Sequence, residues 1–497
     1  MEFDVIIGLE THIQLKTRSK LFCSCSNSSE DLNPNTAICP VCMGHPGVLP
    51  VLNKQALDWA ILMSLGLNME IAKETKFDRK NYFYPDLPKG YQISQFDKPV
   101  GEHGSIIINT DKGEKKIGIT RLHLEEDAAK NLHFEDKTLV DYNRSSTPLV
   151  EIVSEPEMRT PAEAKAYMQE IRLIARYLGI SDADMEKGNL RCDANISLRP
   201  VNEKKLSPKT EIKNINSFKN VEKALTYEVE RQKQLWLSGE PPASEETRGW
   251  DADKGITYSQ RSKEGSDDYR YFPEPDLPLF KISSGMIKQI EEDMVELPIQ
   301  KRQRFAQEYG LAMKDIEVLI ESKALANYFE KVVTELRSWL ETEVEGDHDE
   351  VWEKNRKKVV KLANGWITTE LFKLMKENKL KINDVKITPE NMAEFITLIY
   401  LSKVNSSAAQ IILKEMFDTG ADPTHVMDDK DLGQMEAGEE LDKIIDLIIE
   451  SNPDQVAEFK AGKDPIIKYL IGLGMKATKG KGNPADLENI FREKLKD

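Results

Sequence analysis

Residues 8–16 read Gly-Leu-Glu-Thr-His-Ile-Gln-Leu-Lys, and their side chains alternate with period two. In an extended strand this alternation puts Glu10, His12, Gln14 and Lys16 on one face and the intervening residues on the other. A solvated strand face normally carries scattered Thr, Lys and Ser, whereas this face sets a carboxylate beside an imidazole. The stretch therefore predicts a strand with one core face and one functional face.

Three further segments repeat the pattern and extend the same surface. Their polar faces carry His123, Glu125 and Asp127 in residues 122–127, Arg191, Asp193, Asn195 and Ser197 in residues 190–198, and Glu211 and Lys213 in residues 210–213. Four strands with acid-rich faces predict one large antiparallel sheet whose polar face holds a cation and an anion. Carboxylate oxygens are the ligands that magnesium prefers.

The composition is that of a globular protein without a membrane segment. The chain has 497 residues, of which 39% are hydrophobic and 31% charged, and this length predicts about two to four domains. No apolar run reaches the length of a membrane span, and the start Met-Glu-Phe-Asp lacks the pattern of a signal peptide, so we expect a cytoplasmic location. The formal charge of −16 excludes indiscriminate coating of nucleic acid but allows a local basic patch.

The pattern changes twice along the chain, which predicts an α+β domain at 1–293, a helical domain at 294–400 and a small helical domain at 401–497. The first region has short alternating runs and many turn signals. We expect three helices within it, over residues 54–67, from Thr160 onward and over residues 217–237.

Four of the five cysteines form two close pairs, Cys23-x-Cys25 and Cys39-x-x-Cys42. Two such pairs can supply four thiolates to a tetrahedral zinc ion, so we expect a zinc knuckle at residues 23–42. Because the protein would fill all four positions, the site would be structural and not catalytic. The alternative is four unrelated buried cysteines. Cys192, on the apolar face of its predicted strand, is interpreted as a small buried hydrophobic residue.

Glu10, His12, Glu125 and Glu151 are the candidate metal ligands. Glu151 lies in the otherwise apolar run at residues 148–154, where a lone buried carboxylate would be costly without a partner. A bound cation would supply that partner. The alternative is that each carboxylate is half exposed and paired with an arginine, such as Arg121 or Arg144.

Residues 78–92 mix cations, aromatic side chains and loop-forming residues. Lys80 or Lys89 could hold phosphate groups, and Tyr82 or Tyr84 could stack on a base or ribose. The segment lacks the glycine pattern of a P-loop, and an ordinary surface loop is the alternative. A similar mixture recurs at residues 265–275, with the same alternative.

A small basic region ends this acidic chain. Residues 461–497 contain eight Lys or Arg and five Asp or Glu, and Lys476, Lys479 and Lys481 lie among glycines. Local contact with a phosphate backbone needs such a region. A flexible lysine-rich tail is the alternative.

Taken together, these motifs resemble one family, the B subunits of the glutamyl-tRNA(Gln)/aspartyl-tRNA(Asn) amidotransferases. The resemblance runs through most of the first domain and the extreme C-terminus. Its motifs lie at residues 8–22, 78–92, 123–127, 141–148, 190–198, 265–276 and 474–481.

The resemblance implies a cradle domain like the ATP-using sheet of glutamine synthetase, followed by a helical domain and a tail domain that senses tRNA. ATP would phosphorylate the side-chain carboxylate of Glu or Asp misattached to tRNA, and ammonia would then displace the phosphate. The implied magnesium ligands are His12, Glu125 and Glu151, with Glu10 beside them. Lys80, Tyr82 and Lys89 would lie near the nucleotide, and Asp193 and Glu211 would be further members of the polar face. The four cysteines resemble the zinc form of the family.

The ammonia must come from another protein, because no Ser-Lys amidase signature is evident and Cys192 is expected to be buried. This gap implies a partner amidase, the A subunit, and the resemblance alone implies a small C subunit. Two other functions stay open, a zinc-containing tRNA-binding adapter and a free-standing ligase for small substrates. The sequence also leaves open whether Glu-tRNA(Gln), Asp-tRNA(Asn) or both are substrates.

Overall fold

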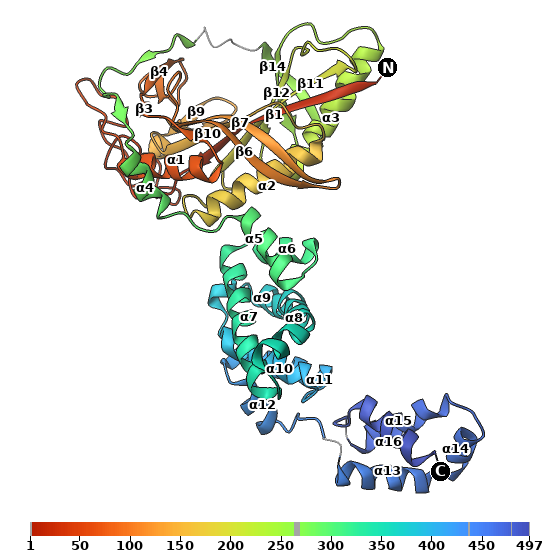
Figure 1. Cartoon of the computed structure of the whole chain (residues 1–497). Coiled ribbons are helices and arrows are strands. Elements are labelled where there is room, and N and C mark those ends of the chain that lie inside the picture. The colour runs from red at the N-terminus through yellow and green to blue at the C-terminus, as the bar shows by residue number, and fades with distance from the viewer. Residues whose placement is uncertain (1, 263–268, 436–437, 479, 497) are drawn as a thin grey trace. The chain divides into compact units, whose positions relative to one another are not determined.

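The computed structural model describes residues 2–262, 269–435, 438–478 and 480–496. It divides into two compact units, Met1–Gln300 and Lys301–Asp497 (Figure 1). The first unit is mixed α+β and the second is helical, as the sequence predicts. The finer domain boundaries at 293 and 400 stay predictions. Within the described ranges, no helix combines the length and the apolar character needed to cross a membrane.

The first unit is built on one nine-stranded sheet with the order β14-β13-β12-β11-β1-β10-β7-β6-β2. Its strands are β1 (Phe3–Gln14), β2 (Glu70–Ile71), β6 (Gly101–Thr110), β7 (Gly113–Glu126), β10 (Pro148–Ser154), β11 (Leu190–Pro200), β12 (Thr210–Ile215), β13 (Glu246–Asp251) and β14 (Ile256–Ser262). All the predicted strand segments belong to this sheet, and β1 lies at its centre between β10 and β11 (Figure 1).

One pair of strands departs from the predicted antiparallel arrangement. β12 and β13 run parallel, because helix α3 (Phe218–Leu237) connects them as a crossover. A parallel pair needs such a long connection, whereas an antiparallel pair can be joined by a tight turn. The prediction of a purely antiparallel sheet is therefore wrong at this pair. Every other neighbouring pair in the sheet is antiparallel.

The apolar face of the sheet fixes where the polar side chains point. In β1 the side chains of Leu9, Thr11 and Ile13 are buried, and Thr11 donates a hydrogen bond to the sulfur of Met168 in α2 (Pro161–Tyr177). Burying one such aliphatic side chain stabilises the fold by about 1.5–3 kcal/mol. A slip of one residue would move this whole set to the wrong face, so the core sets the register.

The three helices predicted in the first unit form where their caps indicate. α1 (Lys54–Gly66) begins after Asn53, and α2 and α3 begin after Thr160 and Ser217. Each cap side chain accepts a hydrogen bond from a backbone N–H of the first turn. The fourth helix of this unit is α4 (Ser284–Glu291).

Three small sheets surround the main one. They pair β15 (Phe272–Pro273) with β4 (Asp78–Asn81) and β5 (Tyr91–Ser94), β16 (Phe280–Lys281) with β3 (Glu74–Thr75), and β8 (Lys130–His133) with β9 (Thr138–Asp141). The cationic and aromatic segment at 78–92 is therefore a hairpin of β4 and β5. Two charge-assisted hydrogen bonds of 2.7 and 2.8 Å from Arg79 to Glu274 tie β4 to the segment that carries β15.

The second unit has two hydrophobic clusters, formed by residues 305–426 and 441–495. Its helices, together with α5 at the junction, are α5 (Pro298–Arg304), α6 (Met313–Ile320), α7 (Lys323–Glu343), α8 (His348–Gly365), α9 (Phe372–Asn378), α10 (Pro389–Tyr400), α11 (Ser406–Thr419), α12 (Pro423–Asp429), α13 (Glu439–Ser451), α14 (Pro453–Lys460), α15 (Ile466–Ala477) and α16 (Pro484–Lys494).

Candidate active site

A row of three side chains crosses the centre of the polar face. Glu151 of β10 is directly opposite His12 of β1 on one side and His123 of β7 on the other. Residues directly opposite in antiparallel strands share a face and can touch. The Oε2 atom of Glu151 lies 3.2 Å from Nε2 of His12 and 3.5 Å from Nε2 of His123.

Glu125 completes this group from β7, two residues beyond His123. Its carboxylate lies 3.8 Å from Nε2 of His12 and 3.5 Å from Nε2 of His123, and Ser94 donates a 3.0 Å hydrogen bond to it. Potential ligand atoms of His12, Glu125 and Glu151 all lie within 4.8 Å of one another. We call these three residues the first cluster.

The electrostatics of the first cluster keep its two carboxylates ionised. Glu125 and Glu151 are 3% and 7% exposed, and burial works against their charge. The neighbouring histidines and Lys80 outweigh burial and lower the pKa of both carboxylates. Burial also opposes the charge of His12, but the hydrogen bond and charge of Glu151 raise its pKa to about 9. Both carboxylates are therefore held ionised, and a divalent cation that displaced the proton from His12 would have two carboxylates and an imidazole as its donor set.

Three more carboxylates form a second cluster on the neighbouring strands. Ligand atoms of Glu10 in β1, Asp193 in β11 and Glu211 in β12 lie within 4.8 Å of one another. Asn195 donates a 3.1 Å hydrogen bond to Glu10, and Lys213 forms ion pairs with both Asp193 and Glu211. The sequence expectation placed Glu10 beside His12, Glu125 and Glu151. The structure instead groups Glu10 with Asp193 and Glu211, which were expected only as further members of the polar face.

A cavity of about 620 Å³ opens beside the second cluster. Glu10, Asn195 and Ser197 line it from the polar face, and a segment containing Lys205 and Lys209 lines it from the side. Its walls also include apolar side chains, among them Ile6, Val153 and Leu206. An apolar wall next to lysines and a carboxylate cluster suits a ligand with an apolar part and an anionic part.

Lys80 and Tyr82 lie on the other side of the first cluster. The ammonium group of Lys80 is 5.8 Å from the ring centre of Tyr82 and 5.0 Å from that of Tyr269. Burial disfavours its charge, but Glu125 and Glu151 outweigh burial and raise its pKa. Within the part of the chain that the structure describes, Lys80 makes no ion pair at contact distance, so its charge remains available to an anion.

Lys89 occupies a different environment from Lys80. Its ammonium group forms a 2.8 Å ion pair with Glu126, whose carboxylate also accepts a 2.9 Å hydrogen bond from the backbone N–H of Ile93. Lys89 and Glu126 line a separate cavity of about 230 Å³ together with Arg79. The structure therefore brings Lys80, but not Lys89, to the first cluster.

His123 is the site residue that the sequence reasoning left out. Its alternation with Glu125 was recognised, but nothing in the pattern showed that β10 would place Glu151 between the two histidines. His123 is 3% exposed, and among the described residues its Nδ1 atom has no hydrogen-bond partner. The contacts of Nε2 with both carboxylates hold them side by side, as residues behind metal ligands commonly do.

Asp127 anchors the edge of the polar face rather than taking part in either cluster. Arg191 donates hydrogen bonds to both carboxylate oxygens of Asp127, one of them at 2.9 Å, and Gln14 donates another at 2.6 Å. Burial opposes ionisation of Asp127, but Arg191 and Arg144 outweigh burial and lower its pKa to about 2. These bonds tie β1, β11 and the end of β7 together next to the first cluster.

We expect Asp127→Asn to destabilise the first unit by about 2 kcal/mol at pH 7, because each unit of pKa shift corresponds to 1.36 kcal/mol. The folded-state pKa of Asp127 is below its unfolded value, so this stabilisation is present above about pH 4 and is lost as the pH falls toward 2. Urea unfolding of wild type and Asp127→Asn measures the difference between their free energies of unfolding. This difference should fall at pH 3 to about half of its value at pH 7.

The exposed ion-pair residue Asp182 provides the control, since Asp182→Asn should change little at any pH. A difference between wild type and Asp127→Asn that does not vary with pH would contradict the role assigned to this carboxylate.

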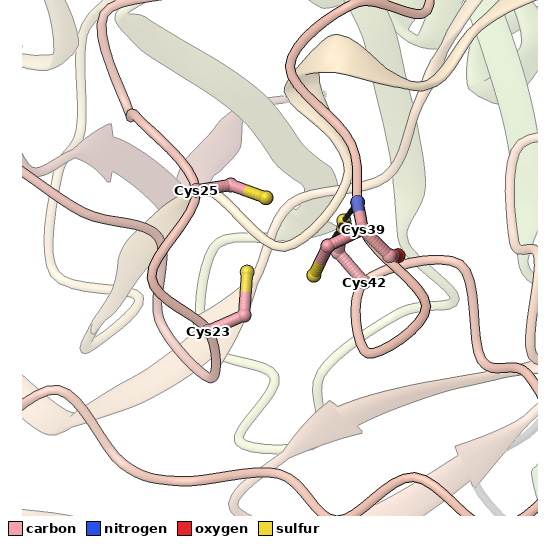
Figure 2. A group of neighbouring side chains, drawn as sticks. All are labelled: Cys23, Cys25, Cys39 and Cys42. Carbon is pink, nitrogen blue, oxygen red and sulfur yellow. Dashed lines mark hydrogen bonds between the residues drawn. The ribbon is translucent and has the colours of Figure 1, made fainter.

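The four cysteines converge as their spacing predicts. Their sulfur atoms lie within 4.8 Å of one another, and Figure 2 shows the thiols of Cys23 and Cys25 pointing toward those of Cys39 and Cys42 from two separate loops. The backbone N–H of Cys39 donates a 3.2 Å hydrogen bond to the sulfur of Cys42. N–H donors of this kind stabilise thiolates, and four convergent thiols are compatible with a structural zinc site.

A buried lysine supports the thiolate form of Cys42. Lys20 is fully buried, donates a 2.9 Å hydrogen bond to the carbonyl of Ala37 and lies 3.9 Å from the sulfur of Cys42. The hydrogen bond from Cys23, opposed by burial and assisted by Lys20, lowers the pKa of the Cys42 thiol to about 5. Cys192 is 2% exposed in the core, as predicted.

The tail lysines have different environments. Lys476 is exposed near the end of α15 and lines a shallow groove with Leu447 and Leu473. Lys481 forms an ion pair with Asp431. Lys479 lies outside the described residues, as do residues 265–268 of the second cationic and aromatic segment.

Comparison with known proteins gives a consistent result over the whole chain. Residues 5–288 match the family model "GatB/GatE catalytic domain", and residues 349–495 match the model "GatB domain". The chain is 45% identical over 498 residues to the aspartyl/glutamyl-tRNA(Asn/Gln) amidotransferase B subunit of Thermodesulfovibrio yellowstonii, with 100% of both chains covered. The identity to the corresponding protein of Persephonella marina is 44%, again with 100% of both chains covered. That of Shouchella clausii is 45% identical, and the comparison covers 100% of this chain and 99% of its relative.

Proposed function

The chain belongs to the family of B subunits of aspartyl/glutamyl-tRNA(Asn/Gln) amidotransferases, and we propose that its two carboxylate clusters form the site of ATP-dependent activation. The enzyme is a ligase that forms Gln-tRNA(Gln) and Asn-tRNA(Asn) with ATP and glutamine.

The reaction needs two steps, because a free carboxylate has no suitable leaving group. In the first step, a side-chain carboxylate oxygen of the tRNA-bound Glu or Asp attacks the γ-phosphorus of ATP, and the bond from that phosphorus to ADP breaks. In the second step, ammonia attacks the carbonyl carbon of the acyl phosphate. The nitrogen loses a proton, and the bond between carbon and the phosphate oxygen breaks, which gives the amide and inorganic phosphate.

The observation that carries this proposal is the arrangement of charge on the polar face. Glu10 and His12, two residues apart in β1, belong to the second and first clusters, so the clusters are neighbours. Lys80 faces the first cluster without an ion-pair partner among the described residues. Five carboxylates, each from a different strand, next to an available ammonium group suit cations that carry the phosphates of a nucleotide.

We assign magnesium to the first cluster, with His12, Glu125 and Glu151 as ligands. A divalent cation there would offset the negative charge that accumulates as a carboxylate approaches a triphosphate. His123 holds Glu125 and Glu151 in place, and Lys80 stabilises the transferred phosphoryl group from the opposite side. Tyr82 contacts Lys80 through its ring and keeps the ammonium group close to the cluster.

We place the nucleoside of ATP in the cavity beside the second cluster. Glu10, Asp193 and Glu211 would hold a second cation on the phosphates, and Lys205 and Lys209 line the same cavity. The γ-phosphate would then extend from the second cluster toward the first. The expected roles of Lys89 in nucleotide binding and of the sheet as a glutamine-synthetase-like cradle remain predictions.

Labelled oxygen in the substrate tests the activation step directly. We expect Glu-tRNA(Gln) with labelled side-chain carboxylate oxygens to transfer one labelled atom to each phosphate that the assembled complex releases. Mass spectrometry of the phosphate measures this transfer, and ATP turnover without tRNA measures uncoupled hydrolysis. Unlabelled phosphate would contradict activation by phosphorylation. Full ATP-dependent amide formation on a small substrate without tRNA would favour a free-standing ligase.

The ammonia source is a separate question. Cys192, the one cysteine outside the four-cysteine cluster, is buried in the core, and burial raises the pKa of its thiol well above the usual value. A thiol in this state is a poor nucleophile. We propose that an amidase, the A subunit, supplies ammonia and that a small C subunit completes a heterotrimer. Because the substrate is a tRNA of translation, we also propose a cytoplasmic location.

We propose that the tail binds tRNA through its exposed lysines, Lys476 above all. We expect Lys476→Glu with Lys481→Glu to weaken tRNA binding and to flatten the dependence of the dissociation constant on salt, because fewer counterions are released. Fluorescence titrations of the assembled complex with tRNA across a salt series measure both effects. Lys331→Glu changes an exposed lysine of α7 and is the control. Identical salt slopes for all three proteins would contradict the role of the tail.

A further inference from the structure

Four aromatic side chains, those of Tyr82, Tyr269, Tyr271 and Phe96, form a series of ring contacts that begins beside Lys80. The rings of Phe96 and Tyr271 stack at a centroid distance of 4.3 Å with an angle of 12° between their planes. Tyr269 lies 6.3 Å from Tyr271 and 5.9 Å from Tyr82, both in edge contacts. We call Phe96 and Tyr271 the aromatic shelf.

The shelf is not part of the hydrophobic core. Phe96 is 49% exposed although Tyr271 stacks against its ring. Its backbone is nevertheless fixed, because the N–H of Phe96 donates a 3.1 Å hydrogen bond to the buried carboxylate of Asp78. A half-exposed aromatic ring on a fixed backbone is a preformed surface for another planar group.

Tyr271 of the shelf interacts with the charged groups of the first cluster. Burial raises the pKa of Tyr271 to about 12, with Lys80 opposing and with Glu125 and Glu151 adding to the rise. These interactions place the Tyr271 hydroxyl in the same charged environment as the first cluster. The ring of Tyr269 lies 5.0 Å from the ammonium group of Lys80 and 6.3 Å from the ring of Tyr271, so a planar group on the shelf would lie near Lys80.

We propose that the aromatic shelf binds the adenine of the terminal adenosine of the misacylated tRNA. This inference rests on the proposed function of the first cluster. The reacting amino acid is esterified to the ribose of that adenosine, so its adenine is covalently tethered to the reacting carboxylate through the ribose and the amino acid. Aromatic rings stack on bases without a need for sequence-specific hydrogen bonds.

ATP brings a second adenine to the reaction, and we place that adenine in the cavity beside Glu10. The cavity beside Glu10 is lined by β1, β10, β11 and the segment at 205–209, whereas Phe96 follows β5 and Tyr271 precedes β15, and neither residue lines that cavity. The two adenines would then occupy different sites in the first unit. The amino acid and the γ-phosphate would meet between Lys80 and the first cluster.

Replacement of Phe96 tests the shelf in the assembled complex. We expect Phe96→Ala to weaken binding of tRNA through its terminal base, which should raise the KM for Glu-tRNA(Gln) by about 5- to 150-fold. The KM for ATP should stay within about two-fold of wild type, which is a smaller change than the one expected in the KM for Glu-tRNA(Gln). Phe96→Trp should restore the wild-type KM, because indole also stacks on a base. Phe134→Ala removes another exposed aromatic ring, in the connection between β8 and β9, and should leave both constants unchanged.

A spectroscopic measurement separates stacking from a general loss of structure. A tRNA with 2-aminopurine in place of the terminal adenine should lose fluorescence when it binds the wild-type complex, because stacking quenches this base. The quenching should be lost with Phe96→Ala and retained with Phe96→Trp and Phe134→Ala, while thermal melting confirms that each variant is folded.

Four outcomes separate this inference from the proposed function. Unchanged quenching and an unchanged KM for tRNA in Phe96→Ala would overturn it. An increased KM for ATP alone would also overturn it, since the shelf would then hold the nucleotide base. If Phe96→Ala behaves as wild type while substitution of Glu125 abolishes activity, the inference fails and the proposed function stands. If substitution of Glu125 has no effect, the proposed function itself fails.

Discussion

Glu125→Gln will lower the rate of Gln-tRNA(Gln) formation by the assembled complex about a thousand-fold. The substitution keeps the size of the side chain and its ability to accept a hydrogen bond from Ser94, but removes a charge from the centre of the first cluster. A neutral amide is a weak ligand for magnesium, so the cation that offsets the charge of the triphosphate would be lost or displaced. We expect kcat to fall more than the affinity for tRNA.

Single-turnover kinetics with Glu-tRNA(Gln), ATP and an ammonium salt measure this effect without any need for glutamine hydrolysis. Glu102→Gln changes an exposed glutamate of β6 and should retain the wild-type rate. The concentration of magnesium that gives half the maximal rate should rise in Glu125→Gln and remain unchanged in Glu102→Gln. A wild-type rate for Glu125→Gln would show that the first cluster is not the site of phosphoryl transfer.

Loss of zinc should destabilise the region around the cysteines without unfolding the whole first unit. Structural zinc sites contribute about 10–16 kcal/mol in isolated peptides, but the main sheet here has a large hydrophobic core of its own. We therefore expect Cys42→Ser to reduce bound zinc from about one equivalent to less than about half. The segment at 23–42 should then become sensitive to proteolysis under conditions where wild type resists cleavage.

Metal analysis of the purified protein and limited proteolysis before and after treatment with a chelator measure both effects. Cys192→Ala removes the buried core cysteine and is the matched control, which should retain its zinc. A Cys42→Ser protein that binds a full equivalent of zinc would contradict a site made by all four thiolates. A wild-type protein purified without zinc would contradict the site altogether.

The strands and the polar face could be predicted from the sequence because their cause is local. The alternation of apolar and polar residues along β1, β7 and β11 is visible in the sequence itself. Once the apolar side chains face the core, the polar side chains must lie on the opposite face of the sheet. The caps of α2 and α3 are also local, since Thr160 and Ser217 bond to N–H groups three residues away. The spacing of the cysteines identified their cluster for the same reason.

The division of the carboxylates into two clusters could not be predicted, because it depends on register between distant strands. Periodicity shows that Glu10 and His12 share a face, but only the pairing of β1 with β11 places Glu10 opposite Asp193. Likewise, only the pairing with β10 places His12 opposite Glu151. The parallel direction of β12 and β13 could not be predicted either. It follows from the crossover through α3 and leaves no signal in the residues of the two strands.

The central position of β1 has a consequence for how the site responds to heat. Glu10 and His12 are separated by two residues of one strand, about 7 Å, and hydrogen bonds to β10 and β11 hold that strand on both edges. The separation of Glu10 from His12, and with it the spacing of the two carboxylate clusters, is thus set by the backbone rather than by mobile side chains. Backbone amides of such a strand exchange with solvent only when a large part of the unit opens. We therefore expect the active geometry to persist almost unchanged up to the melting transition and then to disappear with it, instead of loosening gradually.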